Sequence, residues 1–376
     1  MGITPNKLLS IIDKQKVVLI SGSPGTGKTT LMNQLAQLFV SGLPSSPTPA
    51  HSPASSVPLP ATISSGIGPL PILTASNRKV FRITLHQNSK CKDLISGYLP
   101  NPLGDPNFII VGGSLYEANE YAKEPDHAAL LLIDEINRGP AVEVFGPSIG
   151  AIEADKRLDD VNNVIPTTQS FVILNPKARD TSELYINYQL SPHLYIVAAM
   201  NKADVSVAPL DMAFLRRWRS VELEPDYEFL KSSFRIPPGY CRPTTDTHSP
   251  VQLLDIAIDA LKNINKKITA GRGEAYQLGH GMLLSKTTIN YSSDYNAVCD
   301  HLLASWDTIY SLLQELFFGD ISALSYLLNA NTEHSKYTVS DVSFAGKTSL
   351  IINHPSFDRD DTYNLFLSLT ELYNIV

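Results

Sequence analysis

The sequence lacks three features that would each have assigned it to a protein class. It has no run of about 18 uncharged apolar residues, which is the length that a membrane-spanning helix requires. Residues 1–16 lack the charged-then-apolar layout of a signal peptide. The three cysteines lie far apart in the sequence and form no CxxC pair. These absences predict a cytoplasmic protein without a membrane partner, a disulfide framework or a zinc site.

An excess of positive charge is also missing. The 376 residues include 30 Lys or Arg and 37 Asp or Glu, which gives a net charge of −7. This balance argues against a dominant nucleic-acid-binding face. A chain of this length can bury one large core or two modest ones.

Charge is absent altogether from one long segment. No Asp, Glu, Lys or Arg occurs between Lys28 and Arg78, and Ser, Pro, Ala and Gly dominate residues 41–76. Such a composition buries too little apolar surface to offset the entropy cost of ordering, so we expect a flexible insertion over residues 41–78. A packed apolar loop is the alternative, because Ile and Leu occur near its C-terminal end.

Short apolar runs predict the strands of one sheet. Helical patterns separate them, which favours a parallel sheet with right-handed crossovers and hence an α/β fold. Apolar runs predict strands at Lys16–Ser21, Ala129–Asp134, Leu194–Met200 and Ser220–Leu223, and an alternating pattern predicts one at Lys79–Leu85.

Helical patterns replace these runs beyond about residue 245. One helix carries an apolar face around Leu254 and Leu261, and a second runs through Leu302–Phe318. We therefore expect an α/β domain over residues 1–240, a smaller helical domain over 245–330, and a segment of unassigned packing over 331–376.

A glycine-rich stretch lies between the first expected strand and a helix. Residues 22–29, GSPGTGKT, satisfy the phosphate-binding pattern G-x-x-x-x-G-K-[ST], which we call the P-loop. Backbone N–H groups and the helix N-terminus can bind phosphate oxygens there. We expect Lys28 to reach the β- and γ-phosphates of ATP or GTP, and the Thr29 hydroxyl to bind Mg²⁺. The expected nucleotide-binding residues are Gly22, Ser23, Pro24, Gly25, Thr26, Gly27, Lys28, Thr29 and Thr30.

Two acidic residues end the expected strand Ala129–Asp134. Asp134 can hold Mg²⁺ through its water shell, and Glu135 can orient and deprotonate an attacking water. An acid pair downstream of a P-loop is typical of a nucleoside triphosphatase.

The tetrapeptide Asn201-Lys-Ala-Asp204 has two interpretations. Asn-Lys-x-Asp reads guanine in small G proteins, but that interpretation needs an earlier D-x-x-G element, and the candidate at Asp134 has Asn137 in place of the glycine. In AAA+ ATPases, the polar residue that ends this strand instead contacts the γ-phosphate or the attacking water. We therefore expect Asn201 to be that sensor, with Asp204 as a further candidate catalytic residue.

Several stretches resemble the McrB motor family, the nucleotide-driven subunit of methylation-dependent restriction systems. The central block is Asp134-Glu-Ile-Asn-Arg138-Gly, Val144-Phe-Gly146 and Ile152-Glu-Ala-Asp-Lys-Arg157. The other matching stretches are His86, Ile95-Ser-Gly97-Tyr98, Met200-Asn-Lys-Ala-Asp204-Val-Ser206, Leu210-Asp-Met-Ala-Phe-Leu-Arg216-Arg217-Trp, Leu278-Gly279-His280 and Leu312-Leu-Gln-Glu-Leu-Phe-Phe-Gly319-Asp. The sequence departs from the family at Val205, where the signature has Arg, and at Lys92 and Leu94.

The resemblance implies an AAA+ domain with strand order 5-1-4-3-2 and a helical lid. It also implies a homo-oligomeric, hexameric ring and a McrC-like nuclease or effector partner. Because the P-loop begins at residue 22, we expect DNA to be contacted only indirectly, through a partner.

Three further residues are site candidates through the same resemblance. Arg216 and Arg217 stand where AAA+ subunits direct an arginine into the nucleotide site of a neighbour, where it would stabilise the transferring phosphoryl group. His280 is a candidate nucleotide contact from the lid, and a core histidine is the alternative. As a whole, the sequence favours a McrB-like motor acting in restriction or phage defence. A MoxR-like protein remodeller and a non-hydrolysing, nucleotide-gated scaffold are the alternatives.

Overall fold

The computed structural model describes residues 3–42, 70–101, 108–178, 183–204, 210–284, 289–332, 335–344 and 347–370. The chain forms two compact units. The first contains the chain up to Gly22 and the described residues from Lys28 to Leu223, and the second contains Ser23–Gly27 and the chain from Glu224 onward.

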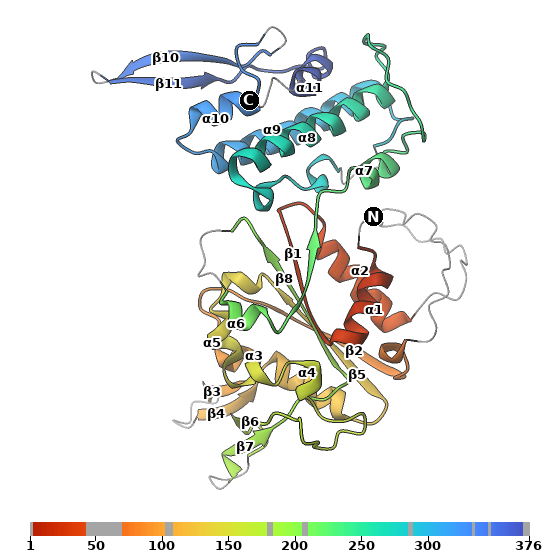
Figure 1. The fold of residues 1–376 in the computed structure, drawn as a ribbon, viewed down its shortest axis with the longest axis vertical. Helices are drawn as coiled ribbons and strands as arrows, with labels where there is room; N and C mark the ends of the chain where they lie inside the picture. Colours follow the sequence, from red (N-terminus) through yellow and green to blue (C-terminus); the bar gives the residue numbers. More distant parts are fainter. Residues whose placement is uncertain are drawn as a thin grey trace. The chain divides into compact units, whose positions relative to one another are not determined.

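A five-stranded parallel sheet forms the centre of the first unit (Figure 1). Its strands are β1 (Val17–Gly22), β2 (Asn77–Thr84), β5 (His127–Asp134), β8 (Leu194–Asn201) and β9 (Arg219–Leu223), in the spatial order β2-β5-β8-β1-β9. Counted along the chain as strands one to five and read from β9, this order is 5-1-4-3-2. The expected parallel α/β sheet is confirmed. Each expected strand overlaps an observed one, and the inner strands β1, β5 and β8 are the nearly continuous apolar runs expected of buried parallel strands.

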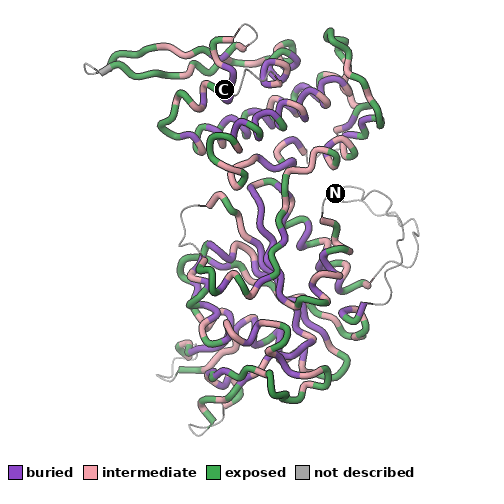
Figure 2. The backbone as a smooth tube through the Cα atoms, viewed as in Figure 1, coloured by how far each residue is buried: buried purple, intermediate pink, exposed green. Residues whose placement is uncertain are grey.

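Both faces of the sheet are covered. One face packs against α1 (Pro5–Gln15) and α2 (Lys28–Ser41), whose apolar side chains share a cluster with Val18 and Leu130. The other packs against α4 (Ser114–Lys123), α5 (Ala141–Phe145) and α6 (Met212–Leu215), in a cluster with Leu131 and Ile196. The short helix α3 (Cys91–Leu94) contributes Leu94 to the second cluster. Figure 2 shows the inner strands buried along most of their length.

Two antiparallel hairpins in this unit were not predicted. β3 (Ser96–Pro100) pairs with β4 (Phe108–Gly112), and β6 (Phe171–Leu174) pairs with β7 (Tyr185–Tyr188). Strands of four or five residues give too short an alternation to separate from loop sequence.

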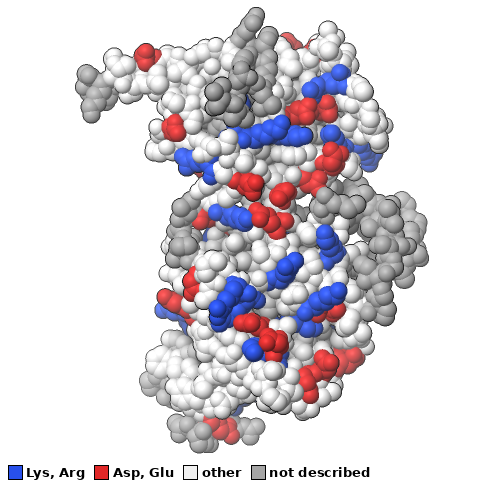
Figure 3. All heavy atoms as spheres, in the orientation of Figure 1, with Lys and Arg blue, Asp and Glu red and all other residues white. Residues whose placement is uncertain are grey.

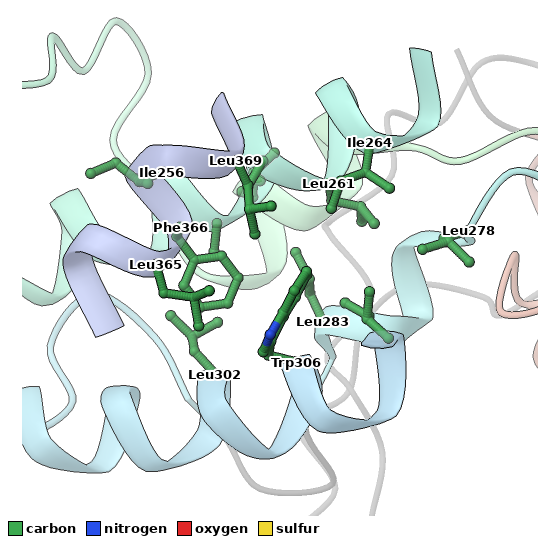
Figure 4. Packing of buried hydrophobic residues seen from close by; sticks show 14 of the residues in the cluster. Ile256, Leu261, Ile264, Leu278, Leu283, Leu302, Trp306, Leu365, Phe366 and Leu369 are labelled. Atoms are coloured by element: carbon green, nitrogen blue, oxygen red, sulfur yellow. The ribbon is translucent and has the colours of Figure 1, made fainter. Parts of the chain in front are cut away.

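The second unit is mainly helical. Its helices are α7 (Tyr227–Ser233), α8 (Pro250–Arg272), α9 (Tyr295–Leu316), α10 (Ile321–Leu327) and α11 (Thr362–Thr370), and β10 (Thr338–Phe344) and β11 (Lys347–Asn353) form a hairpin. Trp306 of α9 packs against Phe366 of α11, in a core that also contains Leu261 of α8 (Figure 4).

The unit boundary falls at Glu224, earlier than the expected boundary near residue 240. The reason is packing, since Leu230, Phe234 and Ile236 are buried in the helical core. The C-terminal segment, whose packing the sequence left unassigned, contributes Tyr337 and α11 to the same core.

The flexible insertion expected over residues 41–78 does not extend over residues 70–78. Pro71–Leu73 forms a 3₁₀ turn, Leu70 and Ile72 are buried in the first unit, and β2 begins at Asn77. Here the packed apolar alternative holds, because apolar side chains at this end reach the core around α1 and α2. Residues 43–69 of the expected insertion lie outside the described part of the chain.

Arg157 is a buried cation in the first unit, with only 1% of its surface exposed. Its guanidinium donates hydrogen bonds to the backbone carbonyls of Ile152, Ser191 and Leu194. Burial lowers its pKa to about 9. The side chain therefore connects the start of β8 to the loop that precedes Arg157.

We expect Arg157→Met to lower the free energy of unfolding by roughly 2–4 kcal/mol, because three buried carbonyls lose their donor. Denaturant unfolding measures the difference. The exposed Arg219 is the matched control, and Arg219→Met should change stability by less than about 0.5 kcal/mol. Equal stabilities of the two variants would contradict this role for Arg157.

Candidate active site

The carboxyl ends of three neighbouring strands bring the main candidate residues to one edge of the sheet. Gly22, the last residue of β1, pairs in register with Asn201, the last residue of β8. On the other side of β8, Ile133 of β5 pairs with Ala198, so Asp134 also lies toward this edge. Ligand sites of open parallel sheets form at this edge.

Lys28 lies within the P-loop and is the first residue of helix α2. Its buried ammonium donates a hydrogen bond to the carbonyl of Gly22, with an Nζ–O distance of 3.0 Å. Burial lowers the pKa of Lys28, and the nearby carboxylates of Glu135, Asp204 and Asp134 oppose that shift. The predicted phosphate-binding cation and the predicted acids therefore lie close enough to interact electrostatically.

Glu135 and Asn201 are joined by hydrogen bonds. Asn201 Nδ2 donates to Oε1 of Glu135 at 3.1 Å and to Oε2 at 3.3 Å. The backbone carbonyl of Asn201 accepts a hydrogen bond from Asn137 Nδ2 at 3.0 Å, which fixes the end of β8. The amide of Asn201 thus faces the carboxylate of Glu135, as a sensor paired with a base requires.

The backbone and environment of Glu135 are unusual for a glutamate. Its φ is +52°, in the left-handed region that non-glycine residues rarely occupy. Such conformations concentrate at functional sites. Burial raises the pKa of Glu135, while the guanidinium of Arg138 acts in the opposite direction.

The sequence assigned Arg138 no role beyond its place in a motif, yet Arg138 connects two of the candidate residues. Its Nε lies 3.2 Å from Oε2 of Glu135, and its Nη2 lies 3.1 Å from Oδ2 of Asp204. The i, i+3 spacing to Glu135 on a helical turn is the signal that could have found the first contact. The second needs the fold, because Asp204 follows a different strand. Val205, the departure from the family signature, lies outside the described residues.

The two arginines expected to act on a neighbouring subunit differ in their surroundings. The Arg217 side chain is 16% exposed and forms an ion pair with Glu153, Nε to Oε1 3.2 Å. Arg216 is exposed. Among the described residues, neither arginine contacts Glu135 or the other candidate residues at the carboxyl ends of the strands.

His280 belongs to the second unit, where it is buried. Its Nδ1 accepts a hydrogen bond from the backbone N–H of Asp226 at 3.1 Å, and its ring lies edge-on to Phe229. Burial lowers the pKa of His280. These contacts are those of a core histidine, and its expected role as a nucleotide contact stays a prediction.

The oxygen donors at the edge of the sheet suit a magnesium ion. The hydroxyl of Thr29 is on an exposed residue in the first turn of α2, and the half-buried Asp134 ends β5. A hydroxyl and a carboxylate, completed by phosphate and water oxygens, are the hard ligands that Mg²⁺ prefers.

Comparison with known proteins agrees with this geometry. Residues 71–218 match the family described as AAA domain (dynein-related subfamily), and residues 5–54 match Novel STAND NTPase 3. The chain is 25% identical over 321 residues, 84% of its length, to the type IV methyl-directed restriction enzyme EcoKMcrB subunit of Escherichia coli K12. It is 37% identical over 95 residues, 25% of its length, to the type II restriction enzyme BsuMI component YdiS of Bacillus subtilis 168. These likenesses support a relation of the chain to the McrB-type AAA+ proteins.

The likeness to these relatives covers only part of their length. The chain spans 57% of the length of the EcoKMcrB subunit and 26% of that of YdiS. Two solved structures have weaker likeness. PCH-2 of C. elegans is 15% identical, and the match covers 81% of this chain and 67% of PCH-2 with a TM-score of 0.30. Hsp104 in a closed state with casein is 15% identical, and the match covers 87% of this chain and 48% of Hsp104 with a TM-score of 0.33.

Two general features complete the description of the chain. Within the described ranges, none of the helices is long and apolar enough to cross a membrane. On the face drawn in Figure 3, the described Lys and Arg side chains lie interspersed with Asp and Glu.

Proposed function

We propose that this chain hydrolyses ATP or GTP with Mg²⁺, as one subunit of a McrB-like ring. The observation that carries the proposal is the hydrogen-bonded pair Asn201–Glu135 beside the Lys28 ammonium. A base, a polar sensor and a phosphate-binding cation at one sheet edge are the parts that nucleotide hydrolysis requires.

In this mechanism the P-loop and Lys28 hold the β- and γ-phosphates. Asn201 orients the attacking water, and Glu135 accepts its proton. The water oxygen attacks the γ-phosphorus, the bond to the bridging oxygen breaks, and a nucleoside diphosphate and inorganic phosphate leave. Mg²⁺ held near Thr29 and Asp134 would supply positive charge to the phosphates. Arg138 keeps Glu135 and Asp204 together while the base acts.

The same pair of residues favours turnover over a non-hydrolysing scaffold. A scaffold needs nucleotide binding alone and has no use for a carboxylate held against an amide at the strand ends. The pairing also supports Asn201 as a sensor instead of a reader of guanine, because its side-chain amide already bonds to Glu135. Neither observation selects ATP or GTP.

For the arginine that completes the site from a neighbouring subunit, we propose Arg216. Arg217 is committed to Glu153 within its own chain, whereas Arg216 is exposed. A trans-acting guanidinium has to extend from the surface of its own subunit, which favours Arg216 over Arg217.

The biological setting proposed is a cytoplasmic restriction or phage-defence system. Both curated relatives carry names of restriction-enzyme components. By that likeness, a hexameric ring would drive a McrC-like nuclease or effector, and DNA would be contacted through that partner. The free thiols of Cys91, Cys241 and Cys299 fit a reducing compartment.

The proposal is tested first at Lys28. Lys28→Ala is expected to weaken nucleotide binding about ten- to hundredfold, because the phosphates lose a charge-assisted hydrogen bond. Calorimetry with ATP and with GTP measures the effect and identifies the preferred base. Lys7→Ala, an exposed lysine of α1, is the control and should bind like the wild type. Unchanged affinity of Lys28→Ala would contradict the assigned phosphate site.

A further inference from the structure

In the second unit, the segment 279–281 around His280 hydrogen-bonds to the P-loop backbone. The N–H of Gly279 donates to the carbonyl of Pro24 at 2.8 Å, and the N–H of Gly281 donates to the carbonyl of Gly25 at 2.8 Å. Both contacts lie within the second unit, which contains Ser23–Gly27 and the chain from Glu224 onward.

The direction of these bonds suits the chemistry of a phosphate loop. A P-loop binds phosphate with its backbone N–H groups, and in a trans peptide the C=O points away from the N–H. The carbonyls of such a loop therefore need donors from another part of the protein. Gly279 and Gly281 supply two of them, and they bond to carbonyl oxygens, leaving N–H groups of the loop for a ligand.

Gly279 and Gly281 lie so close to the P-loop backbone that neither position has room for a side chain. A Cβ placed on Gly279 would lie 2.0 Å from the carbonyl carbon of Gly25 and 2.3 Å from the nitrogen of Thr26. A Cβ on Gly281 would lie 2.7 Å from the Gly25 oxygen. The clashing atoms are backbone atoms, which cannot rotate away. Gly25 itself has a φ of +79°, which a residue with a side chain rarely adopts.

We propose that Gly279 and Gly281 are positioning residues that hold the P-loop backbone in its phosphate-binding conformation. They act through the carbonyls of Pro24 and Gly25 and do not themselves touch the phosphates. A shift of the segment 279–281 therefore alters nucleotide affinity through the backbone of the loop. This inference rests on the proposed function, since it concerns the same nucleotide site.

The test is Gly279→Ala. The new methyl group displaces the backbone of Gly25 and breaks the bond to Pro24, so nucleotide affinity should fall at least about tenfold. Gly271→Ala is the matched control, because Gly271 has no positive φ and nothing within 4 Å of an added Cβ. A fluorescent nucleotide analogue measures both affinities.

A second readout separates positioning from general damage. Hydrogen exchange at Ser23–Gly27 in the absence of nucleotide should become faster in Gly279→Ala, while the amides of α8 and α9 keep their protection. If Gly279→Ala does not fold, Gly281→Ala is used instead, since its added carbon meets only the Gly25 oxygen closely. Wild-type affinity and wild-type exchange in a folded variant would overturn the inference.

The outcome is distinguishable from a failure of the proposed function. If the wild type binds nucleotide and Lys28→Ala binds it at least about tenfold more weakly, the assigned nucleotide site is supported independently of the glycine variants. Loss of binding in Gly279→Ala, with Gly271→Ala unchanged, then supports the positioning role.

Discussion

Arg216→Ala is expected to hydrolyse nucleotide about 10³–10⁵-fold more slowly than the wild type and to bind it with unchanged affinity. In related phosphoryl-transfer enzymes, an arginine that reaches the γ-phosphate from outside contributes a factor of this size. The effect falls on turnover because the guanidinium stabilises charge that develops only during transfer. Steady-state phosphate release and nucleotide affinity, measured on the same preparation, separate the two quantities.

Arg219→Ala is the matched control, because Arg219 is also exposed and lies three residues further along the chain. It should retain wild-type turnover. Arg217→Ala should mainly lower stability, through loss of the ion pair with Glu153. Full turnover by Arg216→Ala together with loss of turnover in folded Arg217→Ala would reverse the assignment between the two arginines.

Mixing variants tests whether the arginine acts across subunits. Lys28→Ala and Arg216→Ala, each impaired alone, should recover activity when mixed, because some interfaces then join an intact P-loop to an intact arginine. Dilution below the assembly concentration should lower turnover per subunit. Activity without concentration dependence, and without recovery on mixing, would leave a self-sufficient monomer.

Glu135→Gln is expected to bind nucleotide and to hydrolyse it about 10²–10⁴-fold more slowly. The amide keeps the shape of the carboxylate but cannot accept the proton of the attacking water. The hydrogen bond from Asn201 can persist through the remaining Oε1, so the local structure should be retained. Single-turnover hydrolysis with preloaded nucleotide isolates this step from binding.

The control is Glu143→Gln on α5, where the glutamate is exposed. It should leave turnover unchanged. Normal single-turnover rates in Glu135→Gln, with the fold intact, would show that another group deprotonates the water. Asp204 would be the next candidate, because Arg138 holds it beside Glu135.

The strands and the core of the candidate site could be predicted because they depend on local sequence. Buried parallel strands appear as apolar runs, and the carboxyl ends of neighbouring strands meet at one edge. Asp134, Glu135 and Asn201 each follow such a run, so the sequence alone indicated that they would lie near Lys28.

The hairpins and the unit boundary depend on contacts that local sequence does not encode. β3, β4, β6 and β7 are too short to give a clear period. The boundary at Glu224 and the packing of α11 are set by side chains such as Leu230 and Phe366, which bury against α8 and α9 from far along the chain.

The sequence by itself therefore indicated the phosphate loop, the acid pair and the resemblance to the McrB family, because each is carried by adjacent residues at fixed spacing. Only the tertiary structure decided that Arg138 bridges Glu135 and Asp204, that Arg217 pairs with Glu153, and that Gly279 lies against Gly25. These contacts join residues on different elements. Their formation depends on distances of a few ångströms that are fixed once the elements pack.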